Sequence, residues 1–255
     1  MAPVAVVTGS SQGIGRAIVL GLADLGYSAV VNFIPPREPA EETRAALEAK
    51  GVECELVEGN VAEAEARARL LQAVLNRWGR LDLLVNNAGI GAPPGDLLDS
   101  EEVAWDRVMG VNCKGAYFLS LAAARVMIDL KQRGVVPHPR LAFISSIRAF
   151  IVSTSRGAYC VSKAAEHMTA QLCAVRLAPE GIPVLEVAPG PIDTPMIASA
   201  REEYLALAAA GAIPAGRVGT VEDVARVIQA FAQGDLDYCT GQQIVVGGGV
   251  HIPQL

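Results

Sequence analysis

The chain has 255 residues, of which 51% are hydrophobic and 19% charged, so it is long and apolar enough to bury a sizeable core. Its formal net charge of −6 argues against a nucleic-acid-binding surface and against attraction to an anionic membrane. No apolar run is long enough to span a bilayer, and the N-terminus lacks the charged and apolar segments of a secretion signal. We therefore expect a cytoplasmic protein that binds neither nucleic acid nor membrane.

Short β-branched runs alternate with helical patterns along the chain, which predicts a doubly wound α/β fold. The strand-like runs are almost continuously apolar, which indicates a seven-stranded parallel sheet buried on both faces and flanked by helices. The predicted strands are residues 4–8, 29–33, 53–57, 81–86, 141–145, 183–188 and 243–246. The predicted helices are residues 14–25, 40–50, 63–77, 103–130, 158–177 and 221–233.

No linker, repeat or low-complexity tract interrupts the chain, so residues 1–255 are expected to form one domain. Gly26, Gly51 and Gly181 each follow a helical pattern and are typical of helix C-terminal caps. Residues 191–219 contain one further helical pattern, and we expect them to form a mobile flap beside the substrate.

Cysteines and histidines predict neither disulfides nor a metal site. The five cysteines are odd in number, scattered and without CxxC spacing, which favours free buried thiols in a reducing compartment. The three histidines, His138, His167 and His251, are not spaced for metal ligation, and no catalytic role is expected for His167.

The first predicted strand runs directly into Gly9-Ser-Ser-Gln-Gly13-Ile-Gly15 and then into a helix. Glycines let the backbone turn tightly and approach a pyrophosphate, and a helix N-terminus supplies free N–H groups and a positive dipole end. A glycine-rich loop alone is weak evidence, but its place between the first strand and the first helix predicts a dinucleotide site.

Tyr159 and Lys163 are four residues apart and therefore share one face of a predicted helix. An unperturbed phenol ionises only near pH 10, and a fixed ammonium beside it favours the phenolate and eases proton transfer. The pair alone is common on exposed helices. Ser146, at the end of the fifth predicted strand and thirteen residues before Tyr159, makes the pattern more specific.

With these residues, Asn86-Asn-Ala-Gly89, Asn112 and Pro189-Gly-Pro-Ile-Asp-Thr194 make the chain resemble the short-chain dehydrogenase/reductase family. The likeness continues through residues 216–225 and 240–249. Among its members the chain looks most similar to bacterial 3-oxoacyl-[acyl-carrier-protein] reductases. The resemblance implies a Rossmann-type fold and an NAD(P)-dependent enzyme that transfers a hydride between nicotinamide and a carbonyl or secondary alcohol.

The resemblance implies a catalytic role for four residues. Tyr159 would be the acid in reduction and the base in oxidation, and Lys163 would assist it and hydrogen-bond the nicotinamide ribose. Ser146 would donate to the substrate oxygen, with neighbouring Ser145 as a rival. Asn112 would hold a water that relays protons to Lys163. Because asparagine is a poor helix former, Asn112 also predicts a kink or a bound water in its helix.

The resemblance also implies a set of cofactor-binding residues. Asn60 stands where the family usually has aspartate, and its amide can still donate to and accept from adenine. Tyr159 and Lys163 belong to the set as well. The other members are Gly9, Ser11, Gln12, Gly13, Ile14 and Gly15 at the pyrophosphate; Phe33, Val61, Asn87, Ala88 and Gly89 around the adenosine; and Pro189, Gly190, Ile192 and Thr194 near the nicotinamide.

The choice between NAD and NADP depends on the end of the second strand. NAD-selective relatives have an aspartate where this chain has Phe33, and NADP-selective relatives often have a basic residue where it has Gln12. Arg37 could reach a 2′-phosphate, or it could be a solvated loop charge among neighbouring glutamates. Because the repelling aspartate is missing, we favour NADP slightly over NAD.

Three kinds of function remain open: a 3-oxoacyl-thioester reductase, a dehydrogenase of a polyol, sugar or other secondary alcohol, and a dinucleotide sensor without catalysis. The Ser–Tyr–Lys set disfavours the sensor. Relatives that accept acyl-carrier protein often have arginine where this chain has Glu180, although Lys131, Arg133 and Arg140 could form a basic patch elsewhere. The expected substrate wall is residues 90–98, 147–156 and 191–216, beyond the carboxyl ends of the strands.

The helical patterns at 103–130 and 158–177 are longer and more apolar than one face of a sheet requires. Relatives pair these helices between subunits, so we expect a homotetramer or a dimer. The apolar tail, residues 250–255, is suited to a further contact between subunits.

Overall fold

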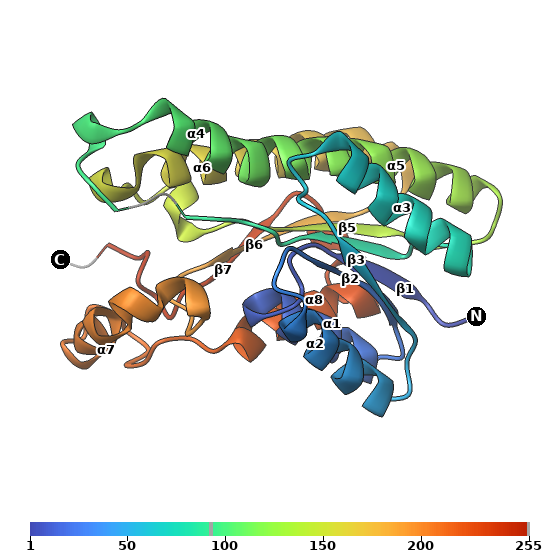
Figure 1. Cartoon of the computed structure of the whole chain (residues 1–255), viewed down its shortest axis with the longest axis horizontal. Coiled ribbons are helices and arrows are strands. Elements are labelled where there is room, and N and C mark those ends of the chain that lie inside the picture. The colour runs from blue at the N-terminus through green and yellow to red at the C-terminus, as the bar shows by residue number, and fades with distance from the viewer. Residues whose placement is uncertain (92–93, 254–255) are drawn as a thin grey trace.

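The computed structural model describes residues 1–91 and 94–253, built around one seven-stranded parallel sheet (Figure 1). The strand order is β3-β2-β1-β4-β5-β6-β7, so the direction of winding reverses between β1 and β4. This confirms the doubly wound fold that the alternating pattern predicts. The strands are β1 (Val4–Val7), β2 (Ser28–Phe33), β3 (Cys54–Glu58), β4 (Leu83–Asn86), β5 (Arg140–Ile144), β6 (Val184–Pro189) and β7 (Gln243–Val246).

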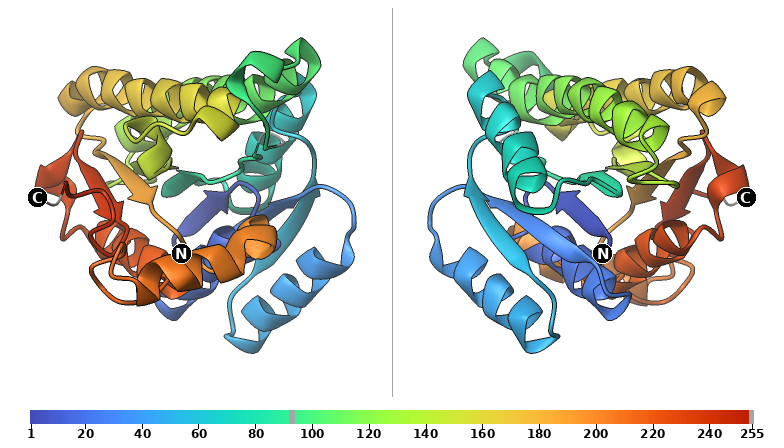
Figure 2. Two further views of the ribbon diagram at one scale, coloured as in Figure 1. Left: turned by 90° about the vertical axis from the view of Figure 1, so that its left-hand side faces the viewer. Right: turned by 90° about the vertical axis from the view of Figure 1, so that its right-hand side faces the viewer.

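Helices cover both faces of the sheet, as the two end-on views in Figure 2 show. Helices α3, α5 and α6 pack on one face, and α1, α2 and α8 pack on the other. The helices are α1 (Gly13–Asp24), α2 (Glu38–Ala49), α3 (Ala64–Trp78), α4 (Glu102–Val108), α5 (Ala116–Gln132), α6 (Gly157–Leu177), α7 (Arg201–Ala209) and α8 (Val221–Gln233).

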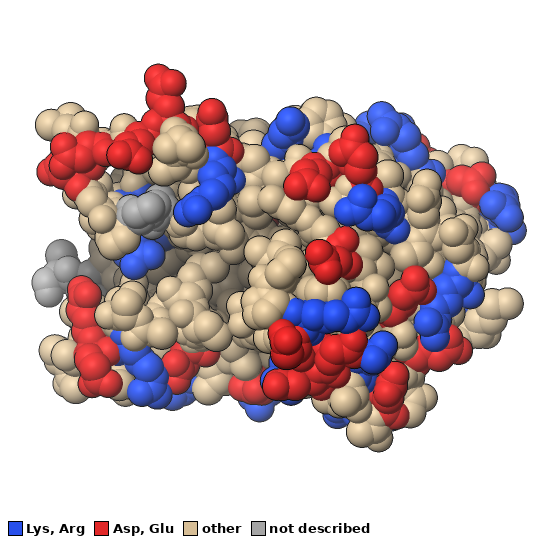
Figure 3. Space-filling model, viewed as in Figure 1, with Lys and Arg blue, Asp and Glu red and all other residues tan. Residues whose placement is uncertain are grey.

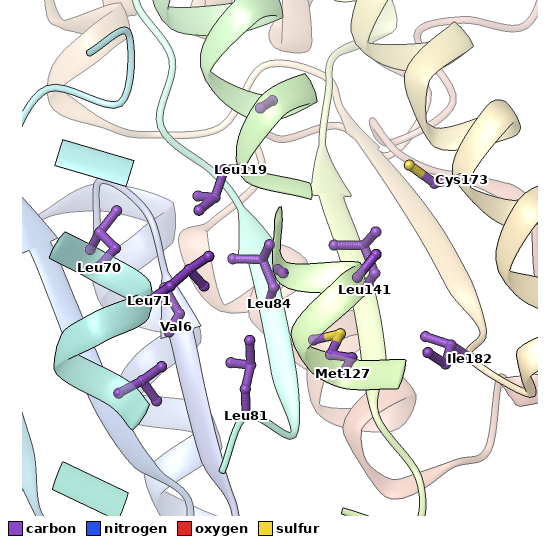
Figure 4. Close-up of a cluster of buried hydrophobic side chains, with 14 of the residues drawn as sticks. Val6, Leu70, Leu71, Leu81, Leu84, Leu119, Met127, Leu141, Cys173 and Ile182 are labelled. Carbon is purple, nitrogen blue, oxygen red and sulfur yellow. The ribbon is translucent and has the colours of Figure 1, made fainter. Parts of the chain in front are cut away.

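Successive side chains of a strand point to opposite faces, and here both faces are buried. In β1, Val4 and Val6 belong to the cluster under α3, α5 and α6, whereas Ala5 and Val7 belong to the cluster over α1 and α8. Figure 4 shows part of the first cluster, in which strand residues such as Val6 and Leu84 lie among leucines of α3 and α5. The strands are therefore continuously apolar because both faces of the sheet are buried, as predicted.

The predicted helix at 103–130 is wrong as a single element. The structure divides it into α4, a π-helical segment η2 (Met109–Gly115) and α5. At the end of η2 the backbone lies so close to Val61 that a Cβ on Gly115 would be 2.9 Å from Val61 Cγ2 and 3.0 Å from Val61 O. Asn112 lies in the middle of η2, which confirms the interruption predicted there.

Segment 191–219 contains the predicted further helix, α7, preceded by a 3₁₀ helix η6 (Pro195–Ala200). Ile192 and Gly219 form an isolated bridge that brings the two ends of the segment together. Helix α7 lies at the same end of the molecule as α4, and Figure 3 shows that this end is hollowed and lined mainly by uncharged residues. That the segment moves as a flap stays a prediction. Among the described residues, no helix is both long and apolar enough to cross a membrane.

Candidate active site

The glycine-rich loop follows β1 and is fastened by residues of the neighbouring strands. Gly9 and Gly13 have φ values of +61° and +56°, in the left-handed region that favours glycine. The Gly9 N–H donates to Asn32 Oδ1 at 3.0 Å, while the Asn32 amide donates to the carbonyl oxygens of Val57 and Gly59. Asn32 is buried in β2. The sequence did not lead us to predict a role for it, although a single polar residue inside an apolar strand was a signal that could have done so.

Gly15 lies where the loop enters α1, and no side chain would fit in its place. A Cβ on Gly15 would lie 2.5 Å from both Gly9 O and Asn87 Nδ2. No side chain caps the N-terminus of α1, and its first turn holds no acidic residue. The first N–H groups of the helix are therefore available to an anion, which favours the predicted pyrophosphate position of Gly13, Ile14 and Gly15. The neighbouring Ser11 carbonyl accepts from Thr43 Oγ1 of α2 at 3.0 Å.

The loop after β4 packs directly against the glycine-rich loop. Asn87 Nδ2 donates to Thr8 O at 2.8 Å and to Gly9 O at 3.1 Å. The backbone N–H groups of Asn87 and Ala88 both donate to Thr8 Oγ1 at 2.9 Å. The structure therefore brings two of the predicted cofactor segments, 9–15 and 87–89, into direct contact.

At the predicted adenine end, the residues lie beside the ends of β2 and β3. Phe33 is 2% exposed at the end of β2, and the Arg37 guanidinium lies 5.7 Å from the centroid of its ring. Arg37 is also paired with Glu41, with 2.8 Å between Nε and Oε1. Asn60 Oδ1 accepts from the Ala62 N–H at 3.0 Å, so part of its hydrogen-bonding capacity serves the loop itself.

At the predicted nicotinamide end, the loop after β6 approaches the glycine-rich loop. A Cβ on Gly13 would lie 3.9 Å from Thr194 Cβ, in ordinary contact. Gly190 is held against the end of β7, where its N–H donates to Val246 O at 2.9 Å and a Cβ would meet Gly247 Cα at 2.7 Å. Ile192 is 3% exposed and Pro189 is the last residue of β6. The predicted nicotinamide-binding residues are therefore packed against the fold.

Lys163 is the centre of the predicted catalytic group and is only 3% exposed. Its Nζ donates to Ile144 O of β5 at 2.9 Å and to Glu166 Oε2 at 2.6 Å, and it lies 5.9 Å from the centroid of the Tyr159 ring. A Cβ on Gly89 would lie 3.5 Å from this nitrogen, so the ammonium is next to the loop after β4. Lys163 of α6 therefore lies next to the predicted cofactor loop at Gly89 as well as near the predicted catalytic Tyr159.

Asn112 is fully buried and fastens the interrupted helix to both neighbours. Its Oδ1 accepts from the Ile90 N–H at 2.8 Å, and its Nδ2 donates to Ile90 O at 2.9 Å and to Ser162 Oγ at 3.0 Å. An amide oxygen has two lone pairs, so Oδ1 keeps one acceptor position that a water could use. The predicted relay position next to Lys163 is compatible with this geometry.

The two candidate serines have different surroundings. Ser146 caps the 3₁₀ helix η3 (Ile147–Ala149), because its Oγ accepts from the Arg148 N–H at 3.1 Å, and its hydroxyl proton remains available. Ser145 points to β6, where its hydroxyl donates to the Glu186 carboxylate. Glu186 is 1% exposed and also accepts from Gln243 Nε2 at 2.6 Å. The engaged hydroxyl of Ser145 favours Ser146 as the substrate donor.

His167 contacts Glu186 as well, with 2.6 Å between Nδ1 and Oε2, and its side chain is 38% exposed. Within residues 1–91 and 94–253 no group of three or more His, Cys, Asp and Glu side chains could hold a metal ion.

Glu166 is the functional candidate that the sequence analysis missed. Its side chain is 1% exposed, its Oε2 contacts Lys163, and its Oε1 is buried without a hydrogen-bond partner among the described residues. Burial raises the pKa of Glu166 to about 7, although Lys163 opposes the rise. Burial also lowers the pKa of the Lys163 ammonium, but the nearby Glu166 and Tyr159 outweigh it and the net shift is upward.

The predicted basic patch of Lys131, Arg133 and Arg140 is wrong for Arg140. This residue is 9% exposed and paired with Asp237, with 2.7 Å between Nε and Oδ1. The predicted wall at 90–98 and the predicted tail at 250–255 include residues 92–93 and 254–255, which lie outside the described residues.

Comparison with known proteins identifies close relatives over almost the whole chain. A family model described as enoyl-(acyl carrier protein) reductase matches residues 9–251. The chain is 34% identical to a 3-oxoacyl-[acyl-carrier-protein] reductase of Staphylococcus aureus over 97% of this chain and 98% of that protein. It is also 34% identical to a short-chain type dehydrogenase/reductase of Picea abies over 96% of this chain and 91% of the relative.

Solved structures agree with these sequence relatives. The crystal structure of a 3-oxoacyl-[acyl-carrier protein] reductase from Brucella melitensis in complex with NAD is similar with a TM-score of 0.94 and 34% identity, covering 100% of this chain and 99% of that one. An acetoin dehydrogenase from Enterobacter cloacae is similar with a TM-score of 0.88 and 30% identity, covering 100% of this chain and 98% of that one.

Proposed function

Because the chain belongs to the short-chain dehydrogenase/reductase family, whose members are NAD(P)-dependent oxidoreductases, we propose that it transfers a hydride between a nicotinamide dinucleotide and a carbonyl or secondary alcohol. The observation that carries the proposal is the meeting of Lys163, Asn112 and Gly89 beside the glycine-rich loop. A dinucleotide fits the residues present, because the N-terminus of α1 has no side-chain cap and no acidic residue in its first turn, so its N–H groups are free to bind a pyrophosphate.

The nicotinamide supplies or accepts the hydride, and the chain supplies proton transfer and orientation. In reduction, the Tyr159 hydroxyl gives its proton to the substrate oxygen as that oxygen gains negative charge, and in oxidation the Tyr159 phenolate accepts the proton of the alcohol. The Lys163 ammonium favours the phenolate that remains. Ser146 donates its free hydroxyl proton to the substrate oxygen, which fixes the oxygen between two donors. Asn112 holds Ile90 and Ser162 in place on either side.

For the substrate, a 3-oxoacyl thioester is our first candidate, supported by the names of two relatives, one in sequence and one in structure. A small secondary alcohol or ketone, including a polyol or sugar, is the second candidate, supported by the similar acetoin dehydrogenase and by Glu180 in a position where carrier-protein reductases often have arginine.

A cofactor-oxidation screen tests the proposal and separates the candidates. Acetoacetyl-coenzyme A, an acetoacetyl-acyl-carrier protein, acetoin, diacetyl and common oxidised sugars are each assayed with NADPH and with NADH. Turnover of a thioester above the small ketones supports the first candidate, and the reverse order supports the second. If no carbonyl compound is reduced although the chain binds a dinucleotide tightly, the proposed catalysis is wrong and a sensor becomes the better interpretation.

For the cofactor, we propose a preference for NADP over NAD. The preference is supported by the missing aspartate at the end of β2 and by Arg37, whose guanidinium lies 5.7 Å from the ring centroid of Phe33, a residue expected at the adenosine. We expect kcat/KM to be higher with NADPH than with NADH, and Arg37→Ala to reduce that ratio about tenfold by removing one charged contact. Arg44→Ala, about two turns further along α2, is the matched control. A hundredfold preference of the wild type for NADH contradicts the proposal.

We also propose that the chain forms a dimer or tetramer through α6. On this helix Val161, Met168, Leu172 and Val175 are between 47% and 78% exposed, and an open groove runs beside Leu172, Val175 and Pro179. A stripe of large apolar side chains on one helix is typical of a subunit interface. Light scattering is expected to give a multiple of 26.6 kDa, and Val175→Glu to lower it. Val152→Glu, on an exposed loop, is the control, and a monomeric wild type contradicts the proposal.

We propose a reducing compartment such as the cytoplasm, because all five cysteines are free. Burial raises the pKa of Cys54 to about 12 and that of Cys173 to about 11, so both stay neutral thiols at physiological pH.

A further inference from the structure

Helix α6 buries a carboxylate at the place where the proposed chemistry needs a positive charge. Lys163 and Glu166 are three residues apart, so both side chains lie on the same side of the helix. They are 3% and 1% exposed, and 2.6 Å separates Nζ from Oε2. An ammonium has three N–H donors, of which Glu166 and Ile144 O take two. One donor therefore remains for the dinucleotide, while the charge of the ammonium acts on Tyr159 through space.

The environment of Glu166 is acidic as well as apolar. From β6, the buried Glu186 faces it and raises its pKa further, and Glu186 is in turn hydrogen-bonded to His167. From η2, Cys113 lies nearby: burial raises the pKa of its thiol, and the Glu166 carboxylate adds to the rise. Lys163 is the cation that faces Glu166 from its own helix, with Tyr159 one turn beyond Lys163. The ionised form of Glu166 is therefore stabilised by one ammonium and destabilised by burial and by a second carboxylate.

We propose that Glu166 is a positioning residue that holds the Lys163 ammonium against β5 and controls how strongly its charge acts on Tyr159. An ionised carboxylate 2.6 Å from the ammonium cancels much of its field at the phenol, whereas a protonated Glu166 leaves the full charge. The unpartnered Oε1 is the oxygen on which the proton would reside. Because burial raises the pKa of Glu166 to about 7, the carboxyl changes state close to neutral pH.

The inference rests on the proposed function for the role of Tyr159, and its test needs no substrate. Phenolate absorbance is titrated in the wild type, and the titration of the Tyr159→Phe chain is subtracted to isolate this tyrosine. Glu166→Gln keeps an oxygen that accepts from Lys163 but removes the charge. We expect the phenolate absorbance of this tyrosine to appear at lower pH in the variant than in the wild type, because a carboxylate no longer offsets the charge of Lys163. Glu180→Gln, which removes a half-buried charge paired with Arg176 beyond the end of the same helix, is the matched control and should not shift it.

A second variant separates positioning from the filling of space. Glu166→Leu occupies a similar volume without any acceptor, so Lys163 loses one of its two anchors. We expect Glu166→Leu to weaken dinucleotide binding about tenfold, and Glu166→Gln to restore affinity to within about twofold of the wild type. If the leucine variant binds as tightly as the wild type, or if Glu166→Gln leaves the phenolate titration unchanged, Glu166 only fills the core and the inference is wrong.

A measurement on the wild-type protein tests the inference even if the variants do not fold. The carboxyl carbon-13 resonance of Glu166 is expected to titrate near pH 7, and titration at the ordinary glutamate range of about 4.3 contradicts the inference. If an active substrate is found, the pH profile of alcohol oxidation should move to lower pH in Glu166→Gln together with the phenolate. Absence of any substrate refutes the proposed function but leaves the absorbance and resonance results to decide the role of Glu166.

Discussion

Replacing Tyr159 by phenylalanine is expected to reduce turnover by at least about a hundredfold while dinucleotide affinity stays within about twofold of the wild type. The change removes only the hydroxyl group, and among the described residues this hydroxyl has no hydrogen-bond partner. Neither the fold nor the cofactor cradle therefore depends on it. What is lost is the proton that the substrate oxygen must receive when a hydride arrives at its carbon.

The measurement is steady-state turnover with the best substrate of the screen, together with calorimetric titration of the dinucleotide. Tyr238→Phe is the matched control, because Tyr238 is fully exposed in the 3₁₀ helix η7 (Asp237–Cys239), far along the chain from the predicted site. Its turnover should equal that of the wild type. If Tyr159→Phe retains more than a tenth of the wild-type rate, the assignment of Tyr159 as the acid is wrong.

The sheet and its order of elements were predictable because they depend on local chemistry. Parallel strands buried on both faces require continuous apolar runs, and those runs are visible in the sequence at β1, β5 and β6. Predicted strand ends lie within two residues of the observed ones, and the differences arise because hydrogen bonding to a neighbouring strand determines the ends. The fifth strand is an example: it was predicted to end at Ser145, but β5 ends at Ile144, and Ser146 already caps η3.

The interruption at Asn112 was predictable only in part. A poor helix former within a helical pattern indicates some distortion, but the π-helical segment depends on contacts across the fold. The Asn112 amide must meet the Ile90 backbone on one side and Ser162 on the other. These partners are 22 and 50 residues away in the chain, and no local pattern reports their position.

Glu166 was not predictable because α6 reverses the usual relation between polarity and burial. Its inner face buries Ser162, Lys163, Glu166 and Thr169, while large apolar side chains such as Met168 and Val175 are exposed on its outer face. A carboxylate three residues after a lysine is normally a solvated pair on a helix surface. Both departures fit the proposals made above: the polar groups lie on the side of the proposed chemistry, and the apolar groups lie on the side of the proposed subunit interface.

Replacing Gly15 by alanine is the second change for which we expect a large effect, and it acts on binding rather than on proton transfer. The added methyl carbon would lie 2.5 Å from Gly9 O and 2.5 Å from Asn87 Nδ2, and 2.8 Å from Ser10 Cα. Two of these three atoms belong to the backbone of the glycine-rich loop, so no rotation of a side chain relieves the contact. The loop must move away from the start of α1, and the Asn87 contacts to Thr8 O and Gly9 O are strained with it.

We expect dinucleotide affinity to fall between about tenfold and a hundredfold, because overpacking of this kind costs roughly 1–3 kcal/mol and each 1.4 kcal/mol is a factor of ten. Calorimetric titration with NADPH and NADH measures the fall. Gly95→Ala is the control, since Gly95 has no atom within 4 Å of the added carbon and no positive φ. A Gly15→Ala chain that binds as tightly as the Gly95→Ala chain contradicts the pyrophosphate assignment. Reduced turnover with unchanged affinity contradicts it equally, since the loop would then serve the chemistry and not the cofactor.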